Sequence, residues 1–216
     1  MKKYQAFDIV ALFLCIFFIP GCSTTYYAVW EQLGKEKRHL LADNVENARD
    51  EQEKASEQFK DALTQIKELY GFEGGDLEDF YIRLRDNYED CEERAQAVEK
   101  RIAKVEQIAT DLFSEWENEL NQMKNETFKA KSRKSLLETK NRYARLNAAM
   151  TKTKQSMEPV LVNLRDYVLF LKHNLNAQAI GALQAEVRDI ELEVETLIAD
   201  MNKSIHEADE FLRDFQ

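Results

Sequence analysis

The chain has 216 residues, with 30 Lys and Arg against 40 Asp and Glu, which gives a formal net charge of −10 at pH 7. This acidic balance disfavours nucleic acid as a partner, because binding to phosphates needs clustered positive charge. Charged residues make up 32% of the chain, and only six Gly and two Pro occur in it. Such a composition is typical of long helices or coiled coils, and the length suits a single domain.

The first residues have the pattern of a signal peptide. Lys2 and Lys3 precede an uncharged run from Ile9 to Ile19, and Cys22 follows Pro20-Gly21 directly. The run of eleven residues is roughly half the ~20 that a membrane-spanning helix needs. Together these features resemble a bacterial lipoprotein signal, in which the cysteine is acylated and becomes the first residue of the mature protein.

We therefore expect residues 1–21 to be a cleaved signal helix and Cys22 to carry lipid, palmitate among its acyl chains, so that the chain is held on a membrane. A plain secretory signal and a short membrane anchor are the alternatives. Ser23, not Asp, follows the cysteine. By resemblance to enterobacterial sorting, this favours the periplasmic face of the outer membrane over the inner membrane. Loss of residues 1–21 would take the net charge from −10 to −11, because that segment holds two Lys and one Asp.

Four long helices are predicted in the rest of the chain. From Leu41 onward, apolar residues recur at alternating steps of four and three, the 3.5-residue period of coiled coils. Short turns join the helical segments, and this favours antiparallel neighbours. We expect an all-α, elongated, antiparallel up-down-up-down four-helix bundle with coiled-coil-like packing. Residues 22–35 are expected to be a lipidated linker or the start of the first helix, and 36–216 a single domain with helices at about 36–70, 76–123, 127–173 and 177–215.

Pro159 falls inside the third predicted helix. Proline removes one backbone hydrogen bond from a helix and clashes with the preceding turn, so we expect a kink near residue 159 or a new helix that begins there. Helices that splay at such a point would leave room for a lipid or another apolar ligand.

Positive charge is concentrated in the third helix. Residues 124–154 hold ten Lys and Arg against two acids, whereas 73–119 hold six against fifteen and 176–216 hold three against ten. The charges are expected to set the register inside the bundle, as e and g charges do in coiled coils. The alternative is an external anion, since an up-down topology places the turn at 121–125 near the lipid anchor. The candidate membrane-proximal basic patch consists of Lys124, Lys129, Lys131, Arg133 and Lys134.

The same topology brings two turns together at the opposite end of the bundle. Polar residues interrupt an apolar run there, and they are expected either to cap the helices or to form a docking tip for a partner. The candidate docking tip consists of Gly74, Gly75, Asp76, His173, Asn174, Asn176 and Gln178.

Residues for catalysis, metal binding or cofactor binding do not converge in this sequence. Cys91 lies on an apolar seam and has acidic neighbours, which disfavours a reactive thiolate. The glycine pair Gly74-Gly75 lacks the Lys-Ser/Thr continuation of a phosphate-binding loop. We therefore expect no enzyme activity, no metal and no cofactor.

Several stretches of the mature chain are distinctive, among them Trp30-Glu31-Gln32-Leu33-Gly34, Leu112-Phe113-Ser114-Glu115-Trp116-Glu117 and Leu171-Lys172-His173-Asn174-Leu175-Asn176. Together they resemble one uncharacterised family of proteobacterial lipoproteins, the domain of unknown function 2959 family. The resemblance implies an anchored helical domain and brings no activity, cofactor or catalytic residue.

The sequence thus favours a membrane-anchored periplasmic lipoprotein that acts as a non-enzymatic helical scaffold or partner-binding post. The expected partners are the membrane, through acylated Cys22, and an envelope protein or a peptidoglycan-associated component. Nucleic acid is not expected as a partner, and the sequence leaves the oligomeric state open. The alternative is a binder of a lipid or other apolar ligand between helices near Pro159.

Overall fold

The computed structural model describes residues 37–71 and 77–215, and Leu40–Gln216 forms a compact unit. Four long helices make up this part of the chain, and no strand occurs in it. Three of them are α4 (Leu77–Gln122), α5 (Glu126–His173) and α6 (Ala177–Phe215). The first, α3 (Lys37–Lys67), continues into the short 3-10 helix η2 (Glu68–Gly71). The predicted all-α four-helix bundle is confirmed; the predicted signal helix and the segment 22–35 lie outside the described residues.

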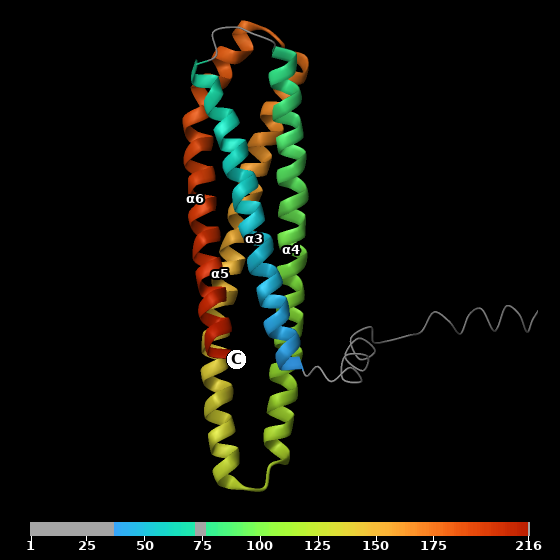
Figure 1. Cartoon of the computed structure of the whole chain (residues 1–216), viewed down its shortest axis with the longest axis vertical. Coiled ribbons are helices and arrows are strands. Elements are labelled where there is room, and N and C mark those ends of the chain that lie inside the picture. The colour runs from blue at the N-terminus through green and yellow to red at the C-terminus, as the bar shows by residue number, and fades with distance from the viewer. Residues whose placement is uncertain (1–36, 72–76, 216) are drawn as a thin grey trace, which may run out of the picture. The chain divides into compact units, whose positions relative to one another are not determined.

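The four helices form a closed ring in the order α3, α4, α5, α6 (Figure 1). Side-chain hydrogen bonds join each neighbouring pair. Gln58 of α3 donates to Asn87 of α4 at 3.2 Å, and Trp116 of α4 donates to Ser132 of α5 at 2.8 Å. The ring is completed by two further donors, Asn163 of α5 to Glu193 of α6 at 2.6 Å and Arg49 of α3 to Asp209 of α6 at 3.0 Å.

The core follows the predicted seams. Every seam position of α3 from Leu41 to Leu69 is buried, and so is every seam position of α6 from Ile180 to Phe215. In α4 the ends of the seam differ from the prediction. Tyr81 and Trp116 are only half-buried, and Phe80 is fully buried instead of Tyr81. The shift by one position near Phe80 places a purely apolar ring in the core and leaves a tyrosine hydroxyl near solvent.

Helix α5 is continuous from Glu126 to His173 and contains Pro159. The option of a new helix that begins at Pro159 is therefore excluded. The proline is exposed, so its ring lies on the outer side of the helix. The predicted kink near 159 stays a prediction.

The helices differ in length, and this leaves part of the bundle uncovered. The two central helices α4 and α5 have 46 and 48 residues, against 31 in α3 and 39 in α6. Figure 1 shows the α4–α5 hairpin continuing beyond the C-terminal end of α6 and the first turns of α3. We call this hairpin, residues 114–138, the arm.

An aromatic cluster closes the bundle where the arm begins. Tyr143 contacts Phe113 edge-on at a centroid distance of 5.5 Å and Phe211 at 6.3 Å, and Phe211 stacks on Phe215 at 4.8 Å. Such pairs add stability beyond the apolar area that they bury. The cluster therefore seals the last layer in which α4, α5 and α6 meet.

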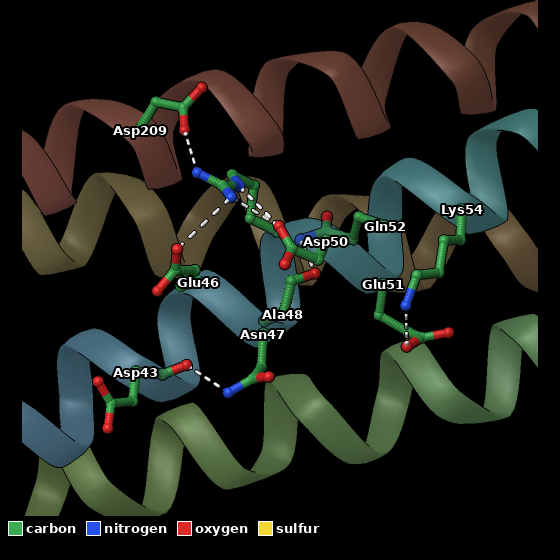
Figure 2. Close-up of polar contacts among 10 residues, drawn as sticks. Asp43, Glu46, Asn47, Ala48, Asp50, Glu51, Gln52, Lys54 and Asp209 are labelled. Atoms are coloured by element: carbon green, nitrogen blue, oxygen red, sulfur yellow. Dashed lines mark hydrogen bonds and ion pairs between the residues drawn. The ribbon is translucent and has the colours of Figure 1, made fainter.

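The core also contains a polar layer. Gln52 and Ser204 are fully buried, and Ser56 is 2% exposed. Arg49 pairs with Asp209 and Lys67 with Glu191, and this register puts Ser204 at a level between Gln52 and Ser56. Figure 2 shows Gln52 on the turn of α3 that carries Asp50 and Glu51.

The polar layer is not fully hydrogen-bonded within the described residues. Gln52 donates through Nε2 to the carbonyl of Ala48 at 3.2 Å, but its Oε1 has no partner there. The hydroxyls of Ser56 and Ser204 lack partners there as well. An unpaired buried polar atom costs about 1–3 kcal/mol, so this layer lowers the stability of the bundle.

Replacing Gln52 should stabilise the fold. We expect Gln52→Leu to raise the free energy of unfolding by about 1–2 kcal/mol, because the substitution removes a buried unpaired acceptor at similar volume. For a domain of this size the midpoint should rise by roughly 2–8 °C in thermal unfolding followed by circular dichroism. The exposed Gln155→Leu is the matched control, with a change within about 0.5 kcal/mol. A lower midpoint for Gln52→Leu would show that the amide is needed in the core.

Candidate functional site

The distal end of the bundle, where α5 meets α6, contains the described part of the predicted docking tip. Two of its asparagines cap helices. Asn174 is the C-cap of α5: its backbone N–H donates to the carbonyl of Leu171 at 3.0 Å and its side chain donates to that of Phe170 at 2.9 Å. The carboxamide oxygen of Asn176 accepts from the backbone N–H of Ala179 at 3.0 Å. These bonds satisfy groups that every helix end leaves open, so capping explains both asparagines.

The other members of the predicted tip add little evidence for a docking site. His173 and Gln178 are exposed. Gly74, Gly75 and Asp76 lie outside the described residues, so the meeting of the two turns at this end stays a prediction.

An apolar surface lies next to these caps, and the sequence interpretation did not find it. Four large apolar side chains of α5 and of the turn after it are exposed: Val162 by 51%, Leu169 by 45%, Phe170 by 39% and Leu175 by 42%. We call these four residues the distal patch. Two more exposed side chains, Tyr70 at 54% and Ile82 at 38%, belong to η2 and α4 at the same end of Figure 1.

The heptad positions of the distal patch explain why it is exposed. The buried residues Met157, Leu164 and Leu171 follow one another in steps of seven and mark the core-facing position a. Val162 and Leu169 are then both at position f, which points away from the core and normally carries polar residues. The segment 160–175 is rich in apolar residues, and in its helical part the heptad register separates core residues from surface residues.

A network of bonds fixes the distal end of α3 to α6. Lys67 pairs with Glu191 at 2.7 Å, and Tyr70 donates to the same carboxylate at 3.3 Å. The hydrogen bond from Lys67, more than the charge beside it, lowers the pKa of Glu191. Gln184 of α6 donates to the carbonyl of Leu69 at 2.7 Å. These contacts hold η2 and the end of α3 against α6 at the distal end of the bundle.

The opposite end is the arm, and it contains the predicted basic patch. Of its five members, Lys134 lies 3.8 Å from Glu138. Within the described residues, no ion pair closer than 4.0 Å involves Lys124, Lys129, Lys131 or Arg133. The structure thus brings the predicted patch together on one hairpin.

Further along α5, basic side chains form ion pairs with the neighbouring helices of the bundle. Lys140 pairs with Glu117 of α4 at 2.5 Å, Arg145 with Glu207 of α6 at 3.6 Å, and Lys152 with Asp200 of α6 at 3.8 Å. The prediction that a basic helix lies between two acidic ones therefore holds for this stretch of α5. It does not hold for residues 124–133, which extend past the neighbouring α6.

A groove of about 350 Å³ lies between α4 and α5. Its lining residues on α5 include Glu158 and Leu161, which flank Pro159 in the sequence. Buried Ala95 and Met157 form part of its floor. Three carboxylates and one Arg are also among its lining residues: Glu92, Glu99, Glu158 and Arg165. The groove opens to solvent between these charges.

The described residues offer no group of three or more His, Cys, Asp or Glu side chains able to hold a metal ion. None of the described helices is long and apolar enough to cross a membrane.

Cys91 is buried in the core of the bundle. Burial, and next the nearby Asp90 and Asp61, raises the pKa of its thiol to about 12. Its Sγ lies 3.7 Å from the carbonyl of Gln58. The thiol is therefore protonated at neutral pH and acts as a small apolar side chain, since the thiolate is the reactive form.

The Cys91 thiol should be protected by the fold. In a chain that lacks residues 1–22, it is the single cysteine, and we expect it to react with a thiol reagent at pH 8 at least 100-fold more slowly in buffer than in denaturant. Because the pKa is higher in the folded chain, this group contributes stability below pH ~8.5 that is lost as the pH rises towards 12. Absorbance of the released chromophore measures the rate. A Cys91→Ala chain reports the background, and equal rates in the two solvents would contradict this assignment.

Residues 26–215 match the family model described as a protein of unknown function (DUF2959). The match includes all four helices and the residues just before α3. A comparison with curated proteins returned no match to the chain.

Proposed function

The chain belongs to the DUF2959 family of proteins of unknown function, and we propose that it is a lipid-anchored helical post of the bacterial envelope that binds a protein partner at its distal end. The anchor is acylated Cys22 on the periplasmic face of the outer membrane, and the role is a scaffold without enzyme activity. The single observation that carries this proposal is the distal patch, an apolar surface on a fully packed bundle.

The bundle suits a post because it is long and continuous. The helices α4 and α5, of 46 and 48 residues, extend about 70 Å at a rise of 1.5 Å per residue. Most of their core positions hold apolar side chains, with Thr139, Thr153 and Ser156 as buried polar residues of α5, and α5 continues through Pro159 without ending. Close-packed helices transmit a displacement from one end to the other, as a spacer or tether requires.

The distal patch suits a protein partner because four large apolar side chains are exposed along the last part of α5 and the turn after it. Full burial of an exposed Leu, Val or Phe side chain contributes roughly 1.5–3 kcal/mol. The four residues are 39–51% exposed, so a partner that covers them gains about half of that from each, and the rest of the interface has to offset the remaining cost of association. Grouped exposed apolar side chains of this kind mark interaction sites more often than isolated ones do. The patch fits an apolar protein surface better than a glycan, which presents hydroxyl groups.

The alternative function, binding of a lipid or another apolar ligand near Pro159, has one observation in its favour. The groove beside this proline, at about 350 Å³, has the volume of a small-molecule site. Its three carboxylates oppose an apolar ligand, because burying them beneath it would remove their water without providing hydrogen bonds. The post is therefore the better supported function.

The anchor can be tested at Cys22 in cells. We expect the full chain to incorporate radiolabelled palmitate and to enter the detergent phase on Triton X-114 partitioning. Cys22→Ala should lose the label completely, because acylation occurs on that sulfur. Cys91→Ala, which leaves the signal intact, is the control and should be labelled as strongly as the unaltered chain. A label retained by Cys22→Ala would refute the lipoprotein assignment.

Binding at the distal patch can be tested with a photo-crosslinking amino acid placed at Leu169 in living cells. We expect one adduct band of defined mass at this position and none at Leu192, which is 56% exposed on α6. Val162 lies at the edge of the distal patch and also lines the groove beside Pro159. Val162→Glu should weaken the Leu169 adduct at least tenfold, because a carboxylate introduced into an apolar contact must lose its water. Circular dichroism of the variant checks the fold. Equal crosslinking at Leu169 and Leu192, or an adduct unaffected by Val162→Glu, would remove the distal patch as a docking site.

A further inference from the structure

We propose that the arm is a second membrane contact, in which the first three turns of α5 bind the surface of an anionic phospholipid bilayer and Phe128 enters its interface. This inference rests on the proposed function, since it assigns the end of the post that faces the anchoring membrane. It concerns different residues from the lipid anchor and from the distal patch.

The first observation is the excess of exposed positive charge at the end of the arm. Between residues 124 and 134 there are five Lys and Arg and a single acid, Glu126. Lys124, Lys131 and Arg133 are exposed, and Lys134 has 78% of its side chain exposed. Lys124 and Lys129 lie nearest the N-terminal end of α5, where the helix dipole disfavours positive charge, so a nearby anion would offset part of that cost.

The second observation is the exposure of Phe128, the most exposed of the large apolar side chains in the described residues, at 64%. In steps of seven along α5, this residue lies on the same row as Ser156 and Asn163, which hydrogen-bond to Asp200 and Glu193 of α6. Helix α6 ends before it reaches the arm, so at Phe128 the same row has no helix to cover it. Among the described residues, no helix covers the ring, so a contact outside the four helices is needed to bury it.

The two features lie on one face. Phe128 and Lys131 are separated by three residues within α5, which makes them neighbours on one face of the helix. Lys134 follows three residues later. Lys124 precedes the N-cap Asn125, in the turn that leads into α5. An exposed aromatic ring flanked by lysines is the arrangement by which interfacial segments bind anionic lipid, with the ring at the level of the headgroups and the ammonium groups on the phosphates.

Acidic residues on α4 do not cancel this surface. Over the whole arm, residues 114–138, five basic side chains stand against five acidic ones, but the acids are not evenly spread. Glu117 pairs with Lys140 at 2.5 Å, and residues 118–134 at the end of the arm keep a net charge of +3. A lipid surface supplies both a field of phosphates and an apolar layer for Phe128. An acidic protein would need a pocket for the ring as well, and a bilayer provides this without a specific fit.

Vesicle flotation can test the proposal with a chain that lacks residues 1–22 and so has no lipid of its own. This chain keeps the compact unit Leu40–Gln216. The probes are vesicles of phosphatidylethanolamine and phosphatidylglycerol at 3:1, and neutral vesicles of phosphatidylcholine. We expect binding to the anionic vesicles in 50 mM salt, loss of binding in 500 mM salt because charges are screened, and at least a tenfold preference over neutral vesicles.

Charge-matched variants locate the contact. Each lysine near an anionic surface contributes roughly a fivefold change in partitioning, so the triple variant Lys124→Gln, Lys131→Gln, Lys134→Gln should bind about 100-fold more weakly. The control changes three exposed lysines elsewhere, Lys60→Gln, Lys100→Gln and Lys154→Gln, and should bind within threefold of the unaltered chain. Phe128→Ser should lower binding about tenfold, whereas Leu192→Ser should not change it.

The outcomes separate this proposal from others. Absence of binding to anionic vesicles, or equal weakening by both triple variants, would overturn it. A chain that ignores vesicles but dimerises in light scattering, with dimer loss on Phe128→Ser, would also overturn it and assign the arm to a second copy. None of these results affects the palmitate assay at Cys22, so failure here leaves the lipid anchor to be decided on its own.

Discussion

The mismatch in length between the helices is the constraint on which the rest of this structure depends. Two helices of 46 and 48 residues pack with two of 31 and 39, so four-helix packing has to stop before α4 and α5 end. At that level Phe113, Tyr143 and Phe211 form the closing aromatic contacts. Beyond that level the two helices of the arm can pack only against each other. The Trp116–Ser132 hydrogen bond and the buried side chains of Leu120 and Leu136 form the small interior between them.

This constraint gives the charges of α5 two different roles. Where α4 and α6 lie alongside, Lys140, Arg145 and Lys152 pair with carboxylates of those helices. Each exposed pair contributes at most about 1 kcal/mol, so their main effect is on which helices become neighbours. Past the end of α6 the basic side chains continue, and of the predicted patch only Lys134 lies within 4.0 Å of a carboxylate in the described residues, that of Glu138 on the same helix. Along α5, the basic residues within the bundle pair with neighbouring helices and set the register, whereas those on the arm face outward.

The polar layer of Gln52, Ser56 and Ser204 shows a second balance within the fold. Unpaired buried oxygens lower stability, yet a seam of uniform apolar residues would pack almost equally well after a slip of seven residues. A slipped register would set these polar groups against different apolar neighbours and would separate Arg49 from Asp209. We interpret the layer as a device that lowers the stability of the native register less than that of its alternatives.

The chain's own periodicity was sufficient to predict the four helices and most core positions, because a 3.5-residue repeat marks the buried side of each helix and short connections favour antiparallel neighbours. The same reasoning found the basic cluster and the asparagine caps. It missed the distal patch, because Val162 and Leu169 differ from their buried neighbours only in heptad position. It also missed the exposure of Phe128. Whether an apolar side chain is covered depends on where the neighbouring helix ends, and that is decided by the relative lengths and register of helices far apart in the chain. Local sequence determined the elements, and tertiary packing alone decided which of their faces are left for partners.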